Sequence, residues 1–400
     1  MKKINYWIWL RKVLGQNADI KRILESELAK GNPKNIYDAD PIERRESLLF
    51  SPGAQKRMND IGLDFTYSVL KKCANESIDI ITPDDDEYPW MLKYIDRFPI
   101  ILFAKGNTEI LGNRNLLPFA MVGTRNATGR GLRIGEKYAS ILAEAGFLIV
   151  SGGALGIDTA SHMGALKTGN PTVAVLGSGI GAKYLKTNRS IRQVIGEKGV
   201  LISEMFPFEE PHKGSFPLRN RILAGMTAGT LVVEAGKRSG SIITAGLAGE
   251  YGRSVFVIPG ETENSPCAGV NNLIYDGGTP VIRPLTIVSE LEPSYPKFFS
   301  RFKETENLYI LTEELAHSDL SDLKSNNETV IRKDTKNLSE IAEALYNSFG
   351  KDTVSMDTLL EETGMPVNKL LGALAELEVS GFIELLPERK YRLKGIDKDG

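Results

Sequence analysis

Two glycine-rich turns hold the residues of this chain that are best suited to bind an anion. They are Val122-Gly123-Thr124-Arg125 and the stretch from Ser151 to Asp158, which reads Ser-Gly-Gly-Ala-Leu-Gly-Ile-Asp. Gly123 lets the backbone approach a ligand closely, and Thr128 is a suitable cap for a following helix whose free amides attract an anion. Arg125 adds a planar guanidinium for bidentate phosphate contact or for stacking on a base. The turns therefore predict phosphate binding, with tight turns that serve only the fold as the alternative.

A parallel sheet must position these turns. Short apolar runs, each followed by a loop and a helical pattern, are typical of parallel strands covered on both faces. The loops at the carboxyl ends of such strands line one crevice, where ligands bind. The predicted strands span residues 117–122, 147–150, 172–176, 200–202, 231–233 and 255–258. The sequence predicts an α/β fold with an extended Rossmann-like parallel sheet.

A further segment pairs a cation with an aromatic ring. Lys213 and Phe216 are predicted to lie in a loop before a helix that Pro217 opens. Sequence-tolerant binding of single strands uses charges that track phosphates and a ring on which a base stacks. In the alternative interpretation, Phe216 packs against Ile222 as a hydrophobic staple and Lys213 is a solvated charge.

With these motifs the chain resembles the DNA-processing protein A family, also called DprA or Smf. The resemblance covers roughly half of the chain and includes both turns. Other matching motifs are Phe216-Pro217-Leu218-Arg219-Asn220-Arg221-Ile222-Leu223-Ala224-Gly225, Arg238-Ser239-Gly240-Ser241 and Ile258-Pro259-Gly260. The resemblance implies a protein that binds single-stranded DNA, forms a homodimer and loads RecA recombinase onto DNA during natural transformation.

The chain departs from the family pattern at two places. Leu185 stands where the family usually has proline, and Glu209 and Glu210 precede Lys213. The two carboxylates weaken the local attraction for phosphate. From the motifs and the family's binding loop together, the predicted nucleic-acid-binding residues are Gly123, Thr124, Arg125, Gly152, Gly153, Lys213, Phe216, Arg219, Asn220 and Lys237.

The charge distribution is compatible with a nucleic-acid partner. The whole chain has 49 basic and 51 acidic residues, a net charge of −2. Residues 116–283, however, hold 17 Lys and Arg against 12 Asp and Glu, which leaves 32 against 39 for the rest. A modestly basic core between acidic ends is a local electrostatic footprint, so stacking and avidity between subunits are expected to add to the affinity.

Two enzyme classes are the alternative. The run Gly177-Ser178-Gly179-Ile180-Gly181-Ala182 matches the dinucleotide fingerprint, and Glu204 follows at the distance of a ribose-binding carboxylate. It follows the third predicted strand, however, where the fingerprint belongs on the first, and Lys183, Tyr184 and Lys186 stand where apolar helix positions should start. A phosphoribohydrolase has a similar strand and turn pattern, but its proline-glycine-glycine loop with a catalytic glutamate is absent from the sequence. The phosphate-binding loop of nucleoside triphosphatases is absent from the sequence as well.

Other catalytic chemistry is sparse. The chain has three histidines and two cysteines, Cys73 and Cys267, without metal-ligand spacing. Asp158 and His162 could form an acid–base pair, but a capping aspartate and a histidine bonded to a neighbouring loop is the preferred interpretation. We predict no catalytic residue, no metal and no cofactor.

The chain is long enough for several domains. We expect an amino-terminal helical domain over residues 1–82, resembling a sterile-alpha-motif or helix-hairpin-helix domain, and an extended Rossmann-like domain over 83–288. A polar linker follows over 289–337, and a winged helix over 338–397. No run of 18 apolar residues occurs, which indicates a cytoplasmic protein without membrane contact and with reduced cysteines.

The winged helix is predicted from three helical segments, 338–349, 356–363 and 366–380, and a hairpin of 382–385 with 391–393. Residues 355–381 contain five acidic side chains against the single Lys369. An acidic helix resists a phosphate groove, so a protein-interaction or self-regulatory role is expected. The hairpin cations Arg389, Lys390 and Arg392 leave a minor DNA role open.

Overall fold

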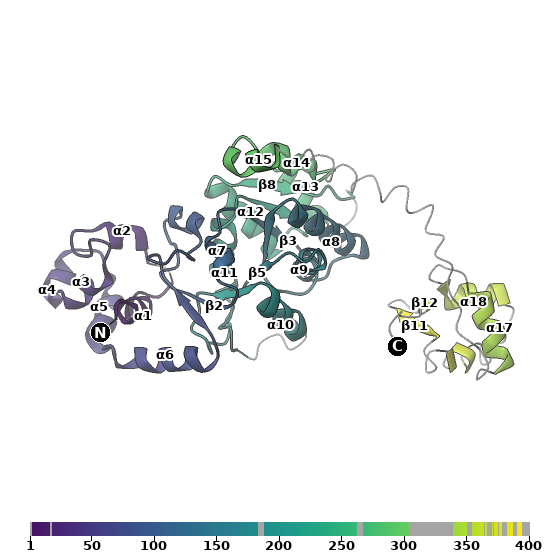
Figure 1. Cartoon of the computed structure of the whole chain (residues 1–400), viewed down its shortest axis with the longest axis horizontal. Coiled ribbons are helices and arrows are strands. Elements are labelled where there is room, and N and C mark those ends of the chain that lie inside the picture. Colours follow the sequence, from purple (N-terminus) through teal and green to yellow (C-terminus); the bar gives the residue numbers. More distant parts are fainter. Residues whose placement is uncertain are drawn as a thin grey trace. The chain divides into compact units, whose positions relative to one another are not determined.

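The chain folds into two compact units, Met1–Asp319 and Leu320–Gly400 (Figure 1). The computed structural model describes residues 2–16, 18–182, 188–261, 267–303, 339–349, 354–363, 365, 370, 372–374, 376–377, 382–386 and 390–393.

Six helices form the amino-terminal part of the first unit. They are α1 (Lys3–Leu14), α2 (Ile20–Glu25), α3 (Pro33–Asp38), α4 (Pro41–Glu46), α5 (Pro52–Asp60) and α6 (Asp64–Asn75). Asn32 and Ser51 cap α3 and α5, each with proline at the first helical position. The polar, proline-containing stretches at residues 31–33 and 51–53 are therefore helix starts. Trp7 and Trp9 of α1 are buried at the centre of this part.

One nine-stranded sheet forms the core of the first unit. Its strands are β1 (Asp79–Ile81), β2 (Leu102–Gly106), β3 (Leu117–Val122), β4 (Phe147–Ser151), β5 (Thr172–Val175), β6 (Val200–Ser203), β7 (Gly229–Val232), β8 (Ser254–Val257) and β9 (Thr279–Pro280). The order is β1-β2-β6-β5-β4-β3-β7-β8-β9. The seven strands β6-β5-β4-β3-β7-β8-β9 pair in parallel, as predicted. Strands β1 and β2 add an antiparallel edge. Residues 79–81 thus belong to the sheet, although the prediction assigned them to the helical domain.

Helices cover both faces of the sheet because alternate strand residues point to opposite sides (Figure 1). On β3, Phe119 and Met121 join one hydrophobic cluster, and Val122 joins another. The covering helices are α8 (Gly129–Glu144), α9 (Ile157–Lys167), α10 (Arg189–Lys198), α11 (Ser215–Gly225), α12 (Gly240–Glu250) and α13 (Ala268–Tyr275). The short helices η1 (Trp90–Tyr94) and α7 (Glu109–Gly112) flank β2 in the chain.

The predicted linker begins too early. Helix α14 (Leu285–Leu291) and helix α15 (Pro296–Lys303) continue the first unit, and Phe298 and Phe299 of α15 are buried against Phe147 of β4. These two rings outweigh the polar character of the surrounding residues, because burying an aromatic side chain removes a large apolar area from water. Residues 304–337 lie outside the described residues.

The second unit contains α17 (Glu340–Ser348), β10 (Val354–Ser355), α18 (Met356–Thr363), β11 (Ile383–Leu386) and β12 (Lys390–Leu393). The predicted hairpin is confirmed, and β10 adds a third strand in the order β10-β12-β11. Glu376 accepts hydrogen bonds from the backbone and the hydroxyl of Ser339, the cap of α17, which lowers the pKa of its carboxyl. Most of residues 366–380 and all of 387–389 lie outside the described residues.

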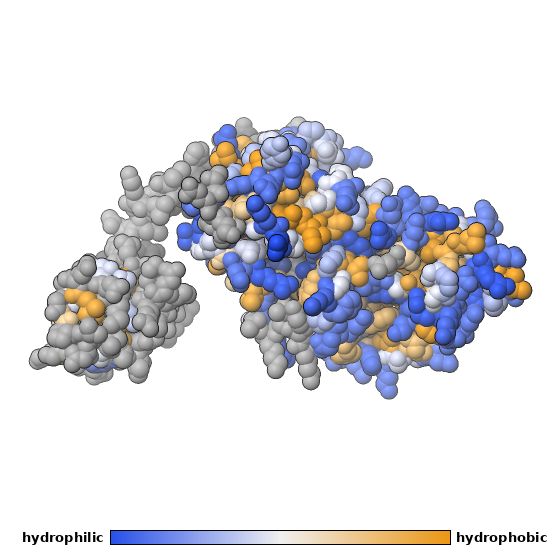
Figure 2. All heavy atoms as spheres, turned by 180° about the vertical axis from the view of Figure 1, so that it is seen from behind, coloured by the Kyte–Doolittle hydropathy of each residue, from blue (hydrophilic) through white to orange (hydrophobic). Residues whose placement is uncertain are grey.

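The visible surface of the first unit is mixed in character. Figure 2 shows hydrophilic side chains over most of this face, with separate hydrophobic patches between them. Within the described part of the chain, no helix has the length and apolar content to cross a membrane.

Candidate functional site

The candidate site is a crevice where the strand order reverses. Strands β4, β5 and β6 follow β3 on one side in the sheet, and β7 then lies on the other side of β3. The loops that follow β3 and β7 therefore diverge. A hollow of about 310 Å³ lies between them, lined by the turn after β3 and the beginnings of α9, α11 and α12. Six of the ten predicted site residues line it: Gly123, Thr124, Arg125, Phe216, Arg219 and Asn220.

The turn after β3 (residues 123–128) is held from two sides. The Thr124 N–H donates to the Glu234 carbonyl at 2.7 Å, and the Thr124 carbonyl accepts the Ile157 N–H at 3.2 Å. A side chain at Gly123 would collide with Ile157. The glycine therefore allows α9 to approach β3, and the backbone groups of Thr124 serve the fold rather than a ligand.

The start of α8 is already occupied by an anion of the protein itself. Thr128 caps the helix as predicted, but its N–H and its hydroxyl both donate to the Glu234 carboxylate, at 3.2 and 2.6 Å. Glu234 is buried at the end of β7, and a side chain at Gly131 would strike it. The Glu234 carboxylate thus lies at the helix start where we predicted a ligand phosphate, and its negative charge disfavours a second anion there.

Arg125 and Phe216 bring a cation and an aromatic ring together in the crevice. The Arg125 guanidinium carbon lies 5.3 Å from the centre of the Phe216 ring, within cation–π distance. Phe216 is half-buried in the first turn of α11, which starts at Ser215, so the ring is not in a loop and Pro217 does not open the helix. A side chain at Gly177 would come within 2.9 Å of the ring. The ring is thus packed against a glycine on one side, and an exposed cation lies near it.

Arg219 and Asn220 are buried, although we predicted that they bind nucleic acid. The Arg219 Nη1 donates to the carbonyls of Gly152, at 2.7 Å, and of Val175, and its Nε donates to Asn220 Oδ1 at 3.2 Å. Asn220 in turn donates to the Gly240 carbonyl at 3.2 Å. A side chain at Gly152 would overlap the guanidinium. These residues join the ends of β4 and β5 to α12 and so fix the crevice wall.

The remaining predicted site residues do not line the hollow. Lys213 and Lys237 are exposed, and within the described residues neither makes an ion pair. Gly153 has a φ of +65°, a conformation that favours glycine, and its carbonyl accepts a hydrogen bond from Asn188. The two lysines are suited to meet phosphates, whereas Gly153 shapes the turn.

Sequence reasoning missed the hydroxyl groups that open α12 into the crevice. Ser239 caps this helix, and its hydroxyl lies 2.8 Å from that of Ser241. Both residues and Thr244 line the hollow. Ser239 and Ser241 belong to a matching motif, so their position after β7, at the switch in strand order, was the signal that could have identified them.

Asp158 is a structural carboxylate at the start of α9. It is buried and accepts the N–H of Ala154 at 3.2 Å. Burial raises the pKa of its carboxyl, and the nearby Arg219 guanidinium opposes that rise. The preferred interpretation of this residue, a helix-start aspartate, is confirmed.

His162 forms a hydrogen bond with Thr172 and not with Asp158. Its Nδ1 lies 2.8 Å from Thr172 Oγ1, which itself donates to the Ile149 carbonyl, so Nδ1 is the donor. Burial lowers the pKa of His162 to about 3, and the ring is neutral near pH 7. The partner is in strand β5 rather than in a loop, and no acid–base pair forms.

The loop after β5 (residues 177–182) is closed by the chain itself. The N–H groups of Gly179 and Gly181 donate to the carbonyls of Glu209 and Pro207, at 2.8 and 2.7 Å. Glu204 is buried and bonded to Arg221 at 2.5 Å, with Arg11 of α1 4.0 Å from its other oxygen. The carboxylate that the dinucleotide interpretation assigns to a ribose is therefore engaged. Residues 183–187, with Lys183, Tyr184, Leu185 and Lys186, lie outside the described residues.

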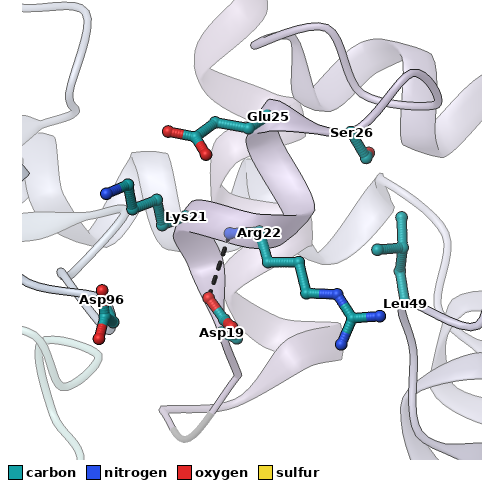
Figure 3. A pocket seen from close by; sticks show the side chains of 7 residues that line it. All are labelled: Asp19, Lys21, Arg22, Glu25, Ser26, Leu49 and Asp96. Carbon is teal, nitrogen blue, oxygen red and sulfur yellow. Dashed lines mark hydrogen bonds between the residues drawn. The ribbon is translucent and has the colours of Figure 1, made fainter.

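Two larger hollows lack the pairing of ring and cation. One of about 430 Å³ beside α2 is lined by Lys21 and Arg22 against Asp19, Glu25 and Asp96 (Figure 3). Its charges nearly balance, and Arg22 donates a backbone hydrogen bond to Asp19. Another of about 800 Å³ beside α10 has cations but no aromatic ring among its described lining residues. Volume alone does not identify a site for single strands, because such a site also needs a stacking surface.

Among the described residues, no group of three or more His, Cys, Asp or Glu side chains has the arrangement of a metal site. Cys73 and Cys267 are both free and buried. Burial raises the pKa of the Cys73 thiol to about 11.

Comparisons with known proteins identify the family and the fold. A family model described as DNA recombination-mediator protein A matches residues 79–292, and one described as the DprA winged helix domain matches residues 332–389. The DNA processing protein DprA of Streptococcus pneumoniae is 42% identical over 208 residues, 52% of this chain and 72% of that protein. Protein Smf of Synechocystis is 28% identical over 334 residues, 82% and 83% of the two chains. The X-ray structure of the pneumococcal protein superposes with a TM-score of 0.63 and 35% identity, covering 72% of this chain and 99% of that one.

Proposed function

This chain belongs to the DNA recombination-mediator protein A family, also called DprA or Smf, and we propose that it binds single-stranded DNA in the switch-point crevice without hydrolysing it. We also propose that it acts as a cytoplasmic homodimer that delivers the strand to RecA recombinase during natural transformation. The dimer and the recombinase follow from the family resemblance. We further propose a helical domain over residues 1–82, a Rossmann-like domain over 83–288, a linker within 289–337 that begins after α15, and a winged helix over 338–397.

The pairing of Arg125 with the Phe216 ring at the crevice is the observation that carries this proposal. A base stacked on the ring takes the place of the guanidinium, and the released cation then meets the adjacent phosphate. Lys213 lies three residues before Phe216, and Lys237 precedes the crevice residue Ser239 by two, so both are near enough in sequence to extend the cationic rim.

The hydroxyl groups at the start of α12 supply the anion-binding part that α8 does not. Because Glu234 fills the start of α8, we assign a phosphate of the strand to the helix start at Ser239 and Ser241. Arg219 and Asn220 position this helix through the Gly240 carbonyl and do not contact the phosphate.

A binding-only role fits the side chains that could have acted as nucleophiles. The Ser151 hydroxyl donates to the Met121 carbonyl at 2.6 Å, and the Ser203 hydroxyl donates to the Ser178 carbonyl at 2.8 Å. His162 is buried against Thr172.

The test is fluorescence anisotropy of labelled single-stranded and double-stranded oligonucleotides with the full chain. We expect tight binding of single strands, weaker binding of duplex, and no turnover of ATP, NADH or nucleoside monophosphates. Turnover that disappears in Asp158→Asn or His162→Asn would contradict the binding-only role. Equal affinity for duplex and single strand would contradict the assignment to unpaired bases.

A further inference from the structure

A second pocket combines aromatic rings with cations. It has a volume of about 460 Å³ and lies between α1, α6 and the segment 206–209, which follows β6. Three phenylalanines line it, Phe65, Phe206 and Phe208, together with Lys12 and Lys72. This pocket joins the amino-terminal helices to the core of the first unit, and none of the ten predicted site residues belongs to it.

The cations in this pocket lie over the rings. The Lys12 Nζ is 5.6 Å from the centre of Phe206, and the Lys72 Nζ is 5.9 Å from the centre of Phe208. Both lysines are exposed, and 43% of the Phe208 surface is accessible. An exposed ring of this size with a cation over its face presents the two parts that single-strand binding requires.

The single carboxylate of the pocket is held by the backbone. Glu209 accepts the Phe206 N–H at 3.2 Å, which closes the turn that presents both rings. The described lining residues therefore carry two cations and one carboxylate, a balance that favours an anionic occupant.

The loop after β5 lies against an aromatic ring of the pocket and against one of the crevice. A side chain at Gly177 would lie 2.9 Å from the Phe216 ring, and one at Gly181 would lie 2.6 Å from the Phe208 ring. Four residues of chain span at most about 14 Å, so the two rings rest on neighbouring parts of one short loop. A strand whose base stacks on Phe216 has a second aromatic surface within reach of its next few nucleotides.

We propose that this pocket is a second base-stacking station for single-stranded DNA, in which Phe208 takes an unpaired base and Lys12 and Lys72 meet the flanking phosphates. The inference rests on the proposed binding of single-stranded DNA at Phe216. It gives the amino-terminal helices a direct role in holding the strand.

The length of the oligonucleotide separates the two stations. Thymidine oligonucleotides of about 4 and about 16 nucleotides represent the two ends of common single-strand site sizes. We expect Phe208→Ala to weaken binding of the long strand roughly 5- to 150-fold, the effect of one lost stacked base, and to leave the short strand unchanged. Phe216→Ala should weaken both. Phe208→Trp should retain binding of the long strand.

Matched lysines on α6 provide the control for charge. Lys72→Ala should lower the salt dependence of long-strand binding by about 0.7 in log–log slope. Lys71→Ala removes an exposed charge from the same helix but outside the pocket, and it should leave both affinity and slope near wild type.

Photocrosslinking tests the contact without a substitution. A long oligonucleotide with 5-bromodeoxyuridine should give adducts on the peptide that contains Phe206 and Phe208. Adducts confined to Phe216, or full long-strand affinity in a folded Phe208→Ala variant, would overturn the second station while leaving the first intact. Wild-type protein that binds neither oligonucleotide would overturn the proposed function itself.

Discussion

The turn after β3 and the loop after β5 show what a glycine pattern does and does not report. The loop after β5 matches the dinucleotide fingerprint more fully, yet its N–H groups donate to the carbonyls of residues 207 and 209. The turn after β3 has one glycine in its motif and borders an open crevice. Glycine spacing indicates that something approaches the backbone closely, but the approaching group is often the protein itself.

The two regions should therefore respond differently to substitution. Side chains that fill the loop after β5 and its surroundings contribute to stability. We expect side chains at the rim of the crevice to contribute to binding instead, because Arg125 and Lys213 are exposed. A residue from one region that behaved like the other would break this comparison.

The largest effect is expected for Glu204→Gln. The substitution removes the carboxylate that pairs with Arg221 and Arg11 in a buried setting, where burial already lowers the pKa of Arg11. Removal of one partner of a buried ion pair costs about 3–5 kcal/mol. The free energy of unfolding from urea titration should fall by about that amount.

The control for this substitution is Glu144→Gln, an exposed carboxylate on α8. Its unfolding free energy should stay within about 0.5 kcal/mol of wild type. If Glu204→Gln kept its stability and instead gained or lost affinity for NAD, the dinucleotide interpretation would return.

The second effect concerns the ring at the crevice. Phe216→Ala should lower affinity for single-stranded DNA roughly 5- to 150-fold, since one stacked base is worth about 1 to 3 kcal/mol. The dependence on salt should stay constant, because stacking releases no counterions. Anisotropy titrations over a range of salt concentrations measure both quantities.

Charge removal at the same rim provides the contrast. Arg125→Ala and Lys213→Ala should each reduce the log–log salt slope by about 0.7, the contribution of one phosphate contact on a single strand. An unchanged affinity in folded Phe216→Ala would return the ring to the staple interpretation.

The sequence predicted the regular elements well and the contents of the crevice poorly. Strand β3 and the cap at Thr128 follow from local patterns, namely an apolar run and a threonine before a helix. Glu234 bonds Thr128 although the two residues are 106 positions apart in the sequence, and no local sequence pattern predicts that contact. Arg219 likewise matches a binding motif, but its guanidinium donates hydrogen bonds to backbone carbonyls at the ends of two strands. Long-range hydrogen bonding decides which polar groups remain for a ligand.

The third effect is a pH dependence of stability from His162. Its pKa in the folded chain is about 3, against an ordinary value of 6.5. Below pH 6.5 the unfolded chain binds a proton that the folded chain does not, so stability falls as the pH decreases from about 6.5 toward 3. Linkage predicts a loss of about 2 kcal/mol between pH 7 and pH 5.

His162→Asn should remove this contribution, whatever its effect at pH 7, and urea titrations at the two pH values measure it. His212→Asn is the matched control, because His212 is exposed and its variant should retain the wild-type pH dependence. A steep pH dependence that persisted in His162→Asn would assign the effect to other groups.

The smallest effect is expected from deletion of residues 338–400. The crevice lies entirely within the first unit, and residues 355–381 carry five acidic side chains against one lysine, so removal of the second unit takes away little attraction for phosphate. Affinity for single-stranded DNA should change by less than about tenfold, or about 1.4 kcal/mol. Anisotropy titration of the truncated chain measures this change, with circular dichroism as the check that the sheet remains folded. A larger loss would make the winged helix a DNA-binding element, and the open crevice would then be only part of the interface.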